Sequence, residues 1–479
     1  MLHILSHKTT NLFDIMAKIF KKVDSLPTTE EKERIYQLCQ SNIASVDQLV
    51  EERFPFFNKR EITLLHDSLN DTDLYTLSTY VDQENEYDCF LILVYLDQSI
   101  QFELSMRHFF DTCDSRQKGI YSFDSLNKNG LGVLLPRFTP KWAKINNVTR
   151  DTCNAKPFSL IKHYIWSADC GDMEVNHVYV DINPLEKNDM EEPFRIVCSP
   201  LVDKRPFEYD TARKVDTEYF YIRDYPQARQ DVILARIKET LRYAGEVRAA
   251  IVFFPEMMIA PENQGIIIQM IRDNWEYDYP KIIYLPSSEY KDGDIWKNQI
   301  IVTNDLGDVL YEYNKQRSYQ YPVKSKDGTI QKMCFEPIVP DKKCTVLHLN
   351  KIGRVGILIC ADIFDDSLKA NLCSKYDLDV LLVAAYTSGW DQFERSVFGM
   401  SDTCCEVIIC NTCSAIENES RDDVYPVAYY PLGHKNKRSH EKKKCEGDCS
   451  GCAFCVDIPN GYKDKITDPL TQRRFERGG

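Results

Sequence analysis

The chain has 479 residues, of which 43% are hydrophobic and 28% charged, and its formal charge at pH 7 is -14. A chain of this length is expected to form two or three domains, each with its own hydrophobic core. The acidic balance argues against general binding to nucleic acid or to an anionic membrane. Eighteen cysteines without an evident secretory signal indicate a reducing, cytoplasmic compartment with no disulfide framework.

Residues 1–70 are predicted to form a helical N-terminal region. Leu12, Ile15 and Ile19 recur at helical spacing and fall on one face together with their apolar neighbours. A capping pattern at 27–33 predicts the start of a second helix.

Residues 71–205 mix short apolar runs with turns, which predicts an α+β region of unknown function. Its most apolar run, 89–96, is much shorter than the roughly 20 residues that a membrane span needs. His108, His163 and His177 are scattered, and we interpret them as surface or core residues rather than ligands.

Residues 206–479 show strand and helix patterns in alternation, beginning with an expected first strand at 219–222. A helix follows, with Ile233, Ile237 and Leu241 on its buried side and Gly245 at its end. Such alternation with apolar strands predicts an α/β fold in which helices cover the sheets.

Three buried strands of this region end in side chains that can react together. The run 249–256 ends in Glu256, the run 307–315 in Lys315, and the run 355–360 in Cys360. A thiol becomes a useful nucleophile when a base takes its proton or a cation lowers its pKa. The three strand ends therefore predict a thiol-dependent active site.

The order Glu256, Lys315, Cys360 resembles the catalytic triad of the nitrilase (carbon–nitrogen hydrolase) superfamily. Asn298 opens the strand before the lysine, as an asparagine does in the family, and Glu336 has the spacing of the second glutamate that many members carry. The resemblance covers about half the chain. It implies a four-layer α-β-β-α sandwich of the nitrilase type, preceded by the helical and α+β N-terminal region.

The resemblance implies a hydrolase that cuts an amide or nitrile through a thioester, without a cofactor. Lys315 would favour the thiolate of Cys360 and stabilise the oxyanion, together with the backbone N–H after the cysteine. Glu256 would carry protons, and Glu336 would orient Lys315 or the substrate nitrogen. The turn at 361–366 departs from the family pattern, which leaves two alternatives open: a binding or regulatory subunit that has lost turnover, and an effector component in microbial defence.

Two cysteine clusters lie near the C-terminus. C-x-x-C spacing with glycines can hold zinc, although reduced thiols and, less favoured, an iron–sulfur cluster are alternatives. The candidate ligands are Cys445, Cys449, Cys452 and Cys455. The second cluster straddles a helix end and a buried strand, where cysteine packs as a small hydrophobe. It comprises Cys404, Cys405, Cys410 and Cys413.

The segment between Trp390 and Cys405 is predicted to form a helix that is unusually rich in apolar bulk. Its apolar residues are Trp390, Phe393, Val397, Phe398 and Met400. They do not share one narrow stripe, so we expect a second copy of the chain to cover part of them in a homo-oligomer. The alternative is that the N-terminal region covers them.

Overall fold

The computed structural model describes part of the chain in detail. The described residues are 12–24, 48, 50–55, 71–83, 86–99, 115–117, 120–122, 133–136, 163–166, 173–180, 193–214, 217–273, 280–324, 329–349, 353–376, 378–400, 405–416, 425–430, 441–443, 452–458 and 470–475. The chain falls into two compact units, one of 1–146 with 154–171 and one of 147–153 with 172–479.

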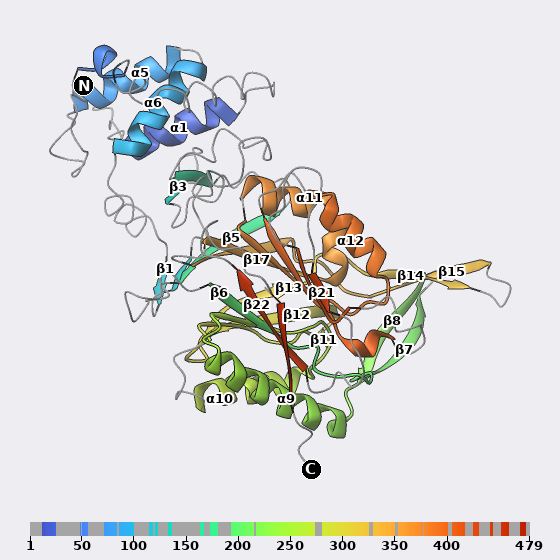
Figure 1. Ribbon diagram of the computed structural model, residues 1–479. Coiled ribbons are helices and arrows are strands. Elements are labelled where there is room, and N and C mark those ends of the chain that lie inside the picture. The colour runs from blue at the N-terminus through green and yellow to red at the C-terminus, as the bar shows by residue number, and fades with distance from the viewer. Residues whose placement is uncertain are drawn as a thin grey trace, which may run out of the picture. The chain divides into compact units, whose positions relative to one another are not determined.

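The first unit contains helices that pack on one another and two short hairpins (Figure 1). The helices are α1 (Leu12–Asp24), α5 (Asp71–Gln83) and α6 (Glu86–Ser99). The hairpins are β1 (Ser115–Gln117) with β2 (Ile120–Ser122), and β3 (Val133–Pro136) with β4 (His163–Trp166). Leu12, Ile15 and Ile19 are buried in α1, as their spacing predicts.

Helical structure in this unit continues beyond residue 70, where we had placed the change to an α+β region. The apolar run 89–96 lies within α6, and its described side chains are buried on every side of the helix. A helix that is apolar all round loses the amphipathic period that identifies helices in a sequence. The second predicted helix, at 27–33, and His108 lie outside the described residues.

The second unit contains two large sheets and one small one. One large sheet has the order β5 (Glu174–Val180), β16 (Lys343–Leu349), β17 (Gly353–Ile359), β18 (Val380–Ala384), β19 (Glu406–Cys410), β20 (Val427–Tyr430), β21 (Glu441–Lys443). The other has the order β11 (Ser288–Asp292), β12 (Ile295–Asn304), β10 (Ile282–Tyr284), β9 (Ile251–Phe253), β6 (Phe194–Cys198), β22 (Cys452–Ile458), β23 (Leu470–Arg474), with β13 (Val309–Asn314) paired to β12. The small sheet has the order β14 (Gln320–Lys324), β15 (Ile330–Phe335), β8 (Thr217–Asp224), β7 (Glu208–Lys214).

Helices lie on the outer side of both large sheets (Figure 1). They are α9 (Gln227–Glu246) and α10 (Gln264–Asp273) on one, and α11 (Asp366–Lys369) and α12 (Trp390–Phe398) on the other. Ile233, Ile237 and Leu241 of α9 are buried against strand residues such as Val252 and Ile283. The predicted buried side of this helix is confirmed. No helix in the described part of the chain is long and apolar enough to cross a membrane.

The second unit begins earlier than the boundary after residue 205 that we expected. Strand β6 pairs with β9 and β22, and β5 pairs with β16, so both belong to the large sheets. The segment between β5 and β6 is acidic and contains prolines, a composition typical of linkers, which explains the boundary that we expected. Residues 219–222, which we expected as the first core strand, lie in β8 of the small sheet and are mostly only half-buried.

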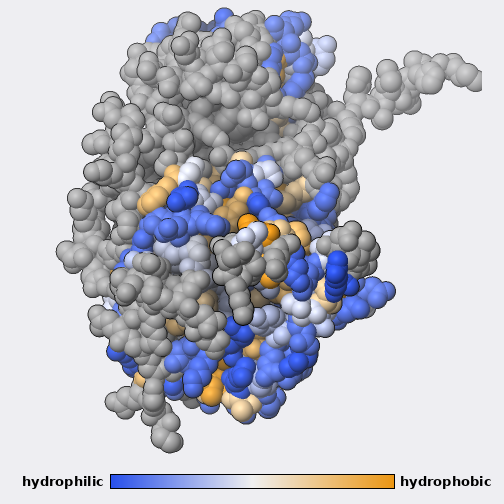
Figure 2. All heavy atoms as spheres, turned by 90° about the vertical axis from the view of Figure 1, so that its right-hand side faces the viewer, coloured by the Kyte–Doolittle hydropathy of each residue, from blue (hydrophilic) through white to orange (hydrophobic). Residues whose placement is uncertain are grey.

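The apolar residues of α12 are largely covered within the chain itself. Trp390, Phe393 and Val397 are buried, as is Met400 just after the helix, whereas Phe398 is 38% exposed. On the face drawn in Figure 2, hydrophobic residues form scattered patches between hydrophilic ones. The homo-oligomer stays a prediction.

Candidate active site

Residues from three strand ends meet between the two large sheets of the second unit. Glu256 lies beyond the end of β9, Lys315 directly after β13, and Cys360 directly after β17. Strands β9 and β13 belong to one large sheet and β17 to the other. Glu336, directly after β15 of the small sheet, joins them. All four residues that we predicted for the site therefore lie together.

Lys315 holds the two glutamates. Its Nζ lies 2.6 Å from Oε1 of Glu256 and 2.6 Å from Oε2 of Glu336, and the side chains of all three are at most 1% exposed. Asn298 links the same two carboxylates, donating from Nδ2 to Oε1 of Glu256 at 2.9 Å and to Oε1 of Glu336 at 3.1 Å. Such a network fixes the ammonium in one position, because each partner is itself held.

Glu336 is further fixed by the segment that follows Lys315. The backbone N–H of Tyr319 donates to Oε2 of Glu336 at 2.9 Å, and the Ser318 hydroxyl donates to its carbonyl at 2.6 Å. Glu336 was predicted from its spacing in the sequence alone, and that spacing does not reveal these contacts. They hold the Glu336 side chain beside Lys315.

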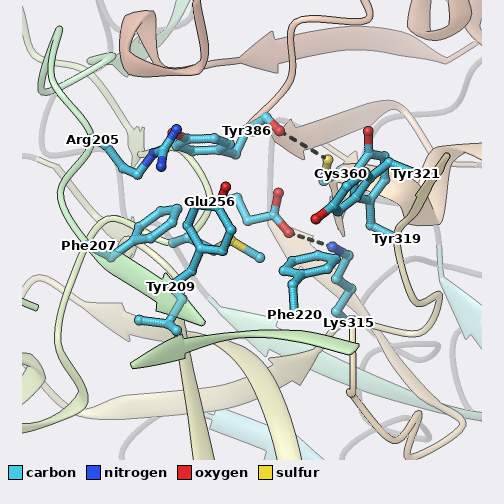
Figure 3. Close-up of a pocket in the computed structure, with 12 residues that line it drawn as sticks. Arg205, Phe207, Tyr209, Phe220, Glu256, Lys315, Tyr319, Tyr321, Cys360 and Tyr386 are labelled. Atoms are coloured by element: carbon cyan, nitrogen blue, oxygen red, sulfur yellow. Dashed lines mark hydrogen bonds and ion pairs between the residues drawn. The ribbon is translucent and has the colours of Figure 1, made fainter. Parts of the chain in front are cut away.

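Cys360 sits on strained backbone in the wall of the cavity. Its φ is 45°, and that of Met257, next to Glu256, is 58°. Non-glycine residues adopt this left-handed region at a cost, and such residues cluster at functional sites. The Cys360 thiol lies 3.9 Å from the carbonyl oxygen of Tyr386 and points, like the Glu256 carboxyl group, into a shared cavity (Figure 3).

Lys315 lowers the pKa of the Cys360 thiol, in the direction we expected, but other effects raise that pKa more. Burial raises the pKa of Cys360 well above its usual range, the negative charge of Glu256 raises it further, and Lys315 lowers it only in part. Burial alone would lower the pKa of Lys315, but the charges of Glu256 and Glu336 raise it well above the usual value. Lys315 is therefore a permanent cation whose charge is already shared between two carboxylates.

Burial also raises the pKa of Glu256, while Lys315 opposes the shift. A carboxylate with a raised pKa is a stronger base than one in water. The site therefore combines a protonated thiol with a neighbouring carboxylate that can accept its proton.

Asp362 ties the lysine segment to the cysteine turn, a role that the sequence did not reveal. Its Oδ1 accepts from the backbone N–H of Gln316 at 2.9 Å and of Arg317 at 2.7 Å. Its Oδ2 accepts from the Tyr313 hydroxyl at 2.8 Å and the Ile359 N–H at 3.1 Å. An acid two residues after the cysteine was the only available signal.

The cavity has a volume of about 180 Å³ and largely aromatic walls (Figure 3). Its lining residues are Arg205, Phe207, Tyr209, Phe220, Ile222, Glu256, Met257, Lys315, Tyr319, Tyr321, Cys360 and Tyr386. Much of this wall comes from β7, β8 and the loop before β7, which sequence reasoning did not connect with the site.

The cysteines considered as zinc ligands are only partly described. Cys452 and Cys455 are buried in β22, three residues apart, so their side chains point to opposite faces of the strand. Cys445 and Cys449 lie outside the described residues, and among those described no cluster of three or more metal-ligating side chains occurs. The zinc site stays a prediction. Cys405, Cys410 and Cys413 are buried, as expected of packing residues.

No protein-family model matches the chain. No curated protein matches it in sequence. Solved structures with a related arrangement include an amidase from Nesterenkonia sp., with 16% identity and a TM-score of 0.34, covering 57% of this chain and 92% of the amidase.

Two further structures are of variants of the Nesterenkonia AN1 amidase. One, described as from the nitrilase superfamily, has 16% identity and a TM-score of 0.34, covering 56% of this chain and 92% of its own. The other, in complex with butyramide, has 13% identity and a TM-score of 0.32, covering 59% and 90%. Similarities of this size do not assign the chain to a family.

Proposed function

We propose that the second unit is a thiol-dependent carbon–nitrogen hydrolase that cuts a non-peptide amide through Glu256, Lys315 and Cys360. The observation that supports this most is the buried contact of Lys315 with both Glu256 and Glu336, in a site that also holds Cys360 on strained backbone. Buried charges are costly unless they are paired, and such clusters in a cavity are typical of active sites. The arrangement as a four-layer α-β-β-α sandwich of the nitrilase type is part of this proposal.

The proposed reaction begins when Glu256 takes the proton of the Cys360 thiol and the sulfur attacks the amide carbon. The developing oxyanion is stabilised by Lys315 and by the backbone N–H of Ala361. Glu256 then gives its proton to the departing nitrogen as the carbon–nitrogen bond breaks, which releases ammonia or an amine and leaves a thioester. Water, deprotonated by Glu256, attacks the thioester and releases the carboxylic acid and the thiol.

In this proposal Lys315 stabilises the oxyanion and does not serve mainly to hold Cys360 as a thiolate. Its charge is shared with two carboxylates at rest, and it remains protonated because they raise its pKa. When Glu256 becomes protonated, the negative charge beside Lys315 falls, and the ammonium can stabilise the oxyanion. In this account proton transfer and oxyanion formation support each other.

Ammonia release from a set of primary amides tests the proposal. The full chain should release ammonia, the Cys360→Ala variant should lose turnover by at least about 1000-fold, and Cys89→Ala, a buried cysteine of the first unit, should keep it. A Cys360→Ala variant that turns over like the wild type would end the mechanism.

A binding or regulatory subunit without turnover is the second candidate. It is favoured by the 3% exposure and raised pKa of Cys360, which make the resting thiol a poor nucleophile. An amide that binds in the cavity but releases no ammonia would support it.

A further inference from the structure

The cavity wall next to Cys360 consists of two groups of aromatic rings. One group is Phe220, Tyr319 and Tyr321, with 5.5 Å between the ring centres of Phe220 and Tyr321 and 6.2 Å between those of Tyr319 and Tyr321. The other includes Phe207 and Tyr386, whose ring centres are 5.3 Å apart. In Figure 3 the two groups stand on either side of the Glu256 carboxyl group.

Aromatic walls attract either a flat ring or a cation. Arg205 already places its guanidinium over the Tyr209 ring, with Cζ 5.0 Å from the ring centre. Its positive charge opposes a second cation at this wall, and the Glu256 carboxylate, which lines the same cavity, opposes an anion. A flat, neutral group remains.

The volume agrees with a single ring. An apolar cavity of roughly 150 Å³ holds one benzene molecule, and this cavity measures about 180 Å³. Resting on the proposed function, we infer that the acyl group of the substrate carries one aromatic ring, held between the two groups of rings while its amide carbon meets Cys360.

Phenylacetamide, cyclohexylacetamide and betaine amide test this inference because they differ mainly in flatness and charge. The full chain should hydrolyse phenylacetamide with a kcat/KM at least about tenfold above that of cyclohexylacetamide, and betaine amide should be the poorest substrate. The Phe220→Leu variant should reduce the ratio of the first two. Tyr75→Leu, which changes a tyrosine of the first unit that is 72% exposed, should leave the ratio unchanged.

Calorimetric titration of the Cys360→Ala variant measures binding without turnover. If the wild type hydrolyses no amide but phenylacetamide binds this variant most tightly, the proposed function fails and the inference on the ligand stands. Equal or better hydrolysis or binding of cyclohexylacetamide or betaine amide, or no binding and no hydrolysis of phenylacetamide, would overturn the inference.

A second, independent observation concerns Glu289, which lies directly across from Asn298 in the paired strands β11 and β12. Cross-strand partners of this kind project from the same face of the sheet. Glu289 is 2% exposed, and its Oε1 accepts from the Ile222 N–H at 3.0 Å. Its Oε2 is buried and has no hydrogen-bond partner, and neither has Oδ1 of Asn298.

The orientation of Asn298 is fixed by its other end. Its Nδ2 donates to Glu256 and to Glu336, so both amide hydrogens are used and the oxygen cannot exchange places with the nitrogen without facing carboxylates. A proton on Oε2 of Glu289 would give both of these buried acceptors a partner. An ionised Glu289 cannot supply one.

We propose that Glu289 is a protonated positioning residue that donates its carboxyl hydrogen to Oδ1 of Asn298 and so holds the amide against Glu256 and Glu336. Burial and the charge of Glu336 raise the pKa of Glu289 well above its usual range, which agrees with this assignment. The cluster then has two ionised glutamates around one ammonium instead of three.

Glutamine and methionine at this position separate the alternatives. A neutral amide can donate the same hydrogen bond, so Glu289→Gln should keep kcat and the pH profile within about threefold, whereas Glu289→Met should lose at least about 30-fold. Loss of turnover in Glu289→Gln as large as in Glu289→Met would show that a carboxylate is needed and overturn the proposal.

Infrared spectroscopy tests the proton itself, whatever the activity. The difference spectrum between the wild type and Glu289→Gln at pH 8 should contain the C=O stretch of a protonated carboxyl group. A carboxylate band in its place would overturn the proposal, even if a variant lost turnover for other reasons.

Discussion

Asp362→Asn is the substitution that most directly perturbs the link between Lys315 and Cys360. The side chain keeps its size, but one of its two oxygens becomes an NH₂ group. The Asp362 carboxylate accepts three backbone N–H groups and one hydroxyl, so the amide must turn a donor toward other donors.

The cost of each placement of the amide can be worked out from these contacts. With its NH₂ toward Tyr313 and Ile359, the Tyr313 hydroxyl can rotate to accept, but its own hydrogen and the Ile359 N–H both lose their acceptor. The opposite placement leaves the N–H groups of both Gln316 and Arg317 without an acceptor. Either placement orphans two donors, which costs about 2–6 kcal/mol.

Urea unfolding at pH 8 measures this cost. Burial raises the pKa of Asp362 to about 7, while hydrogen bonds from Tyr313, Ile359 and Arg317 oppose the shift, so the carboxylate is mostly ionised at pH 8. Asp366→Asn, at a side chain in the same turn that is 95% exposed, is the matched control and should change stability little. An Asp362→Asn variant as stable as the wild type would refute the role of Asp362 as a clamp.

Three further predictions concern protons and metal. Because burial raises the pKa of Glu256 above 4.5, kcat/KM should begin to fall on the acid side at a pH above 4.5; an acid limb at or below 4.5 would exclude Glu256 as the base. Burial lowers the pKa of His177 from 6.5 to about 3, so as the pH drops the unfolded chain binds a proton at this residue before the folded chain does. The free energy of unfolding should therefore fall between pH 6.5 and pH 3, by about 2 kcal/mol at pH 5 from this residue. His177→Gln should flatten that slope in urea titrations. If Cys445, Cys449, Cys452 and Cys455 hold zinc, the purified chain should contain about one equivalent by elemental analysis, and its absence would leave these residues as thiols.

The sequence allowed the strand-end residues of the site to be predicted because each follows an apolar strand. Glu256, Lys315 and Cys360 could be found in this way, and Glu336 by its spacing. The partners of these residues could not be found, because Asp362 and Glu289 are held by hydrogen bonds from segments that lie far from them in the chain.

The boundary of the second unit was missed for a related reason. Strands β5 and β6 are short and separated by an acidic segment, and only their pairing with β16, β9 and β22 shows that they belong to the large sheets. The helix α6 was missed because its apolar side chains surround it. Long-range pairing and complete burial both erase the local pattern on which sequence reasoning depends.

Mass spectrometry of the chain mixed with an amide that it hydrolyses tests the central claim most directly. Rapid acid quenching should trap a thioester, seen as the mass of one acyl group on the peptide that contains Cys360. The acyl mass should be absent from Cys360→Ala and present in the Cys89→Ala control. Ammonia release with no acyl group on Cys360, or with the acyl group on another residue, would contradict the account.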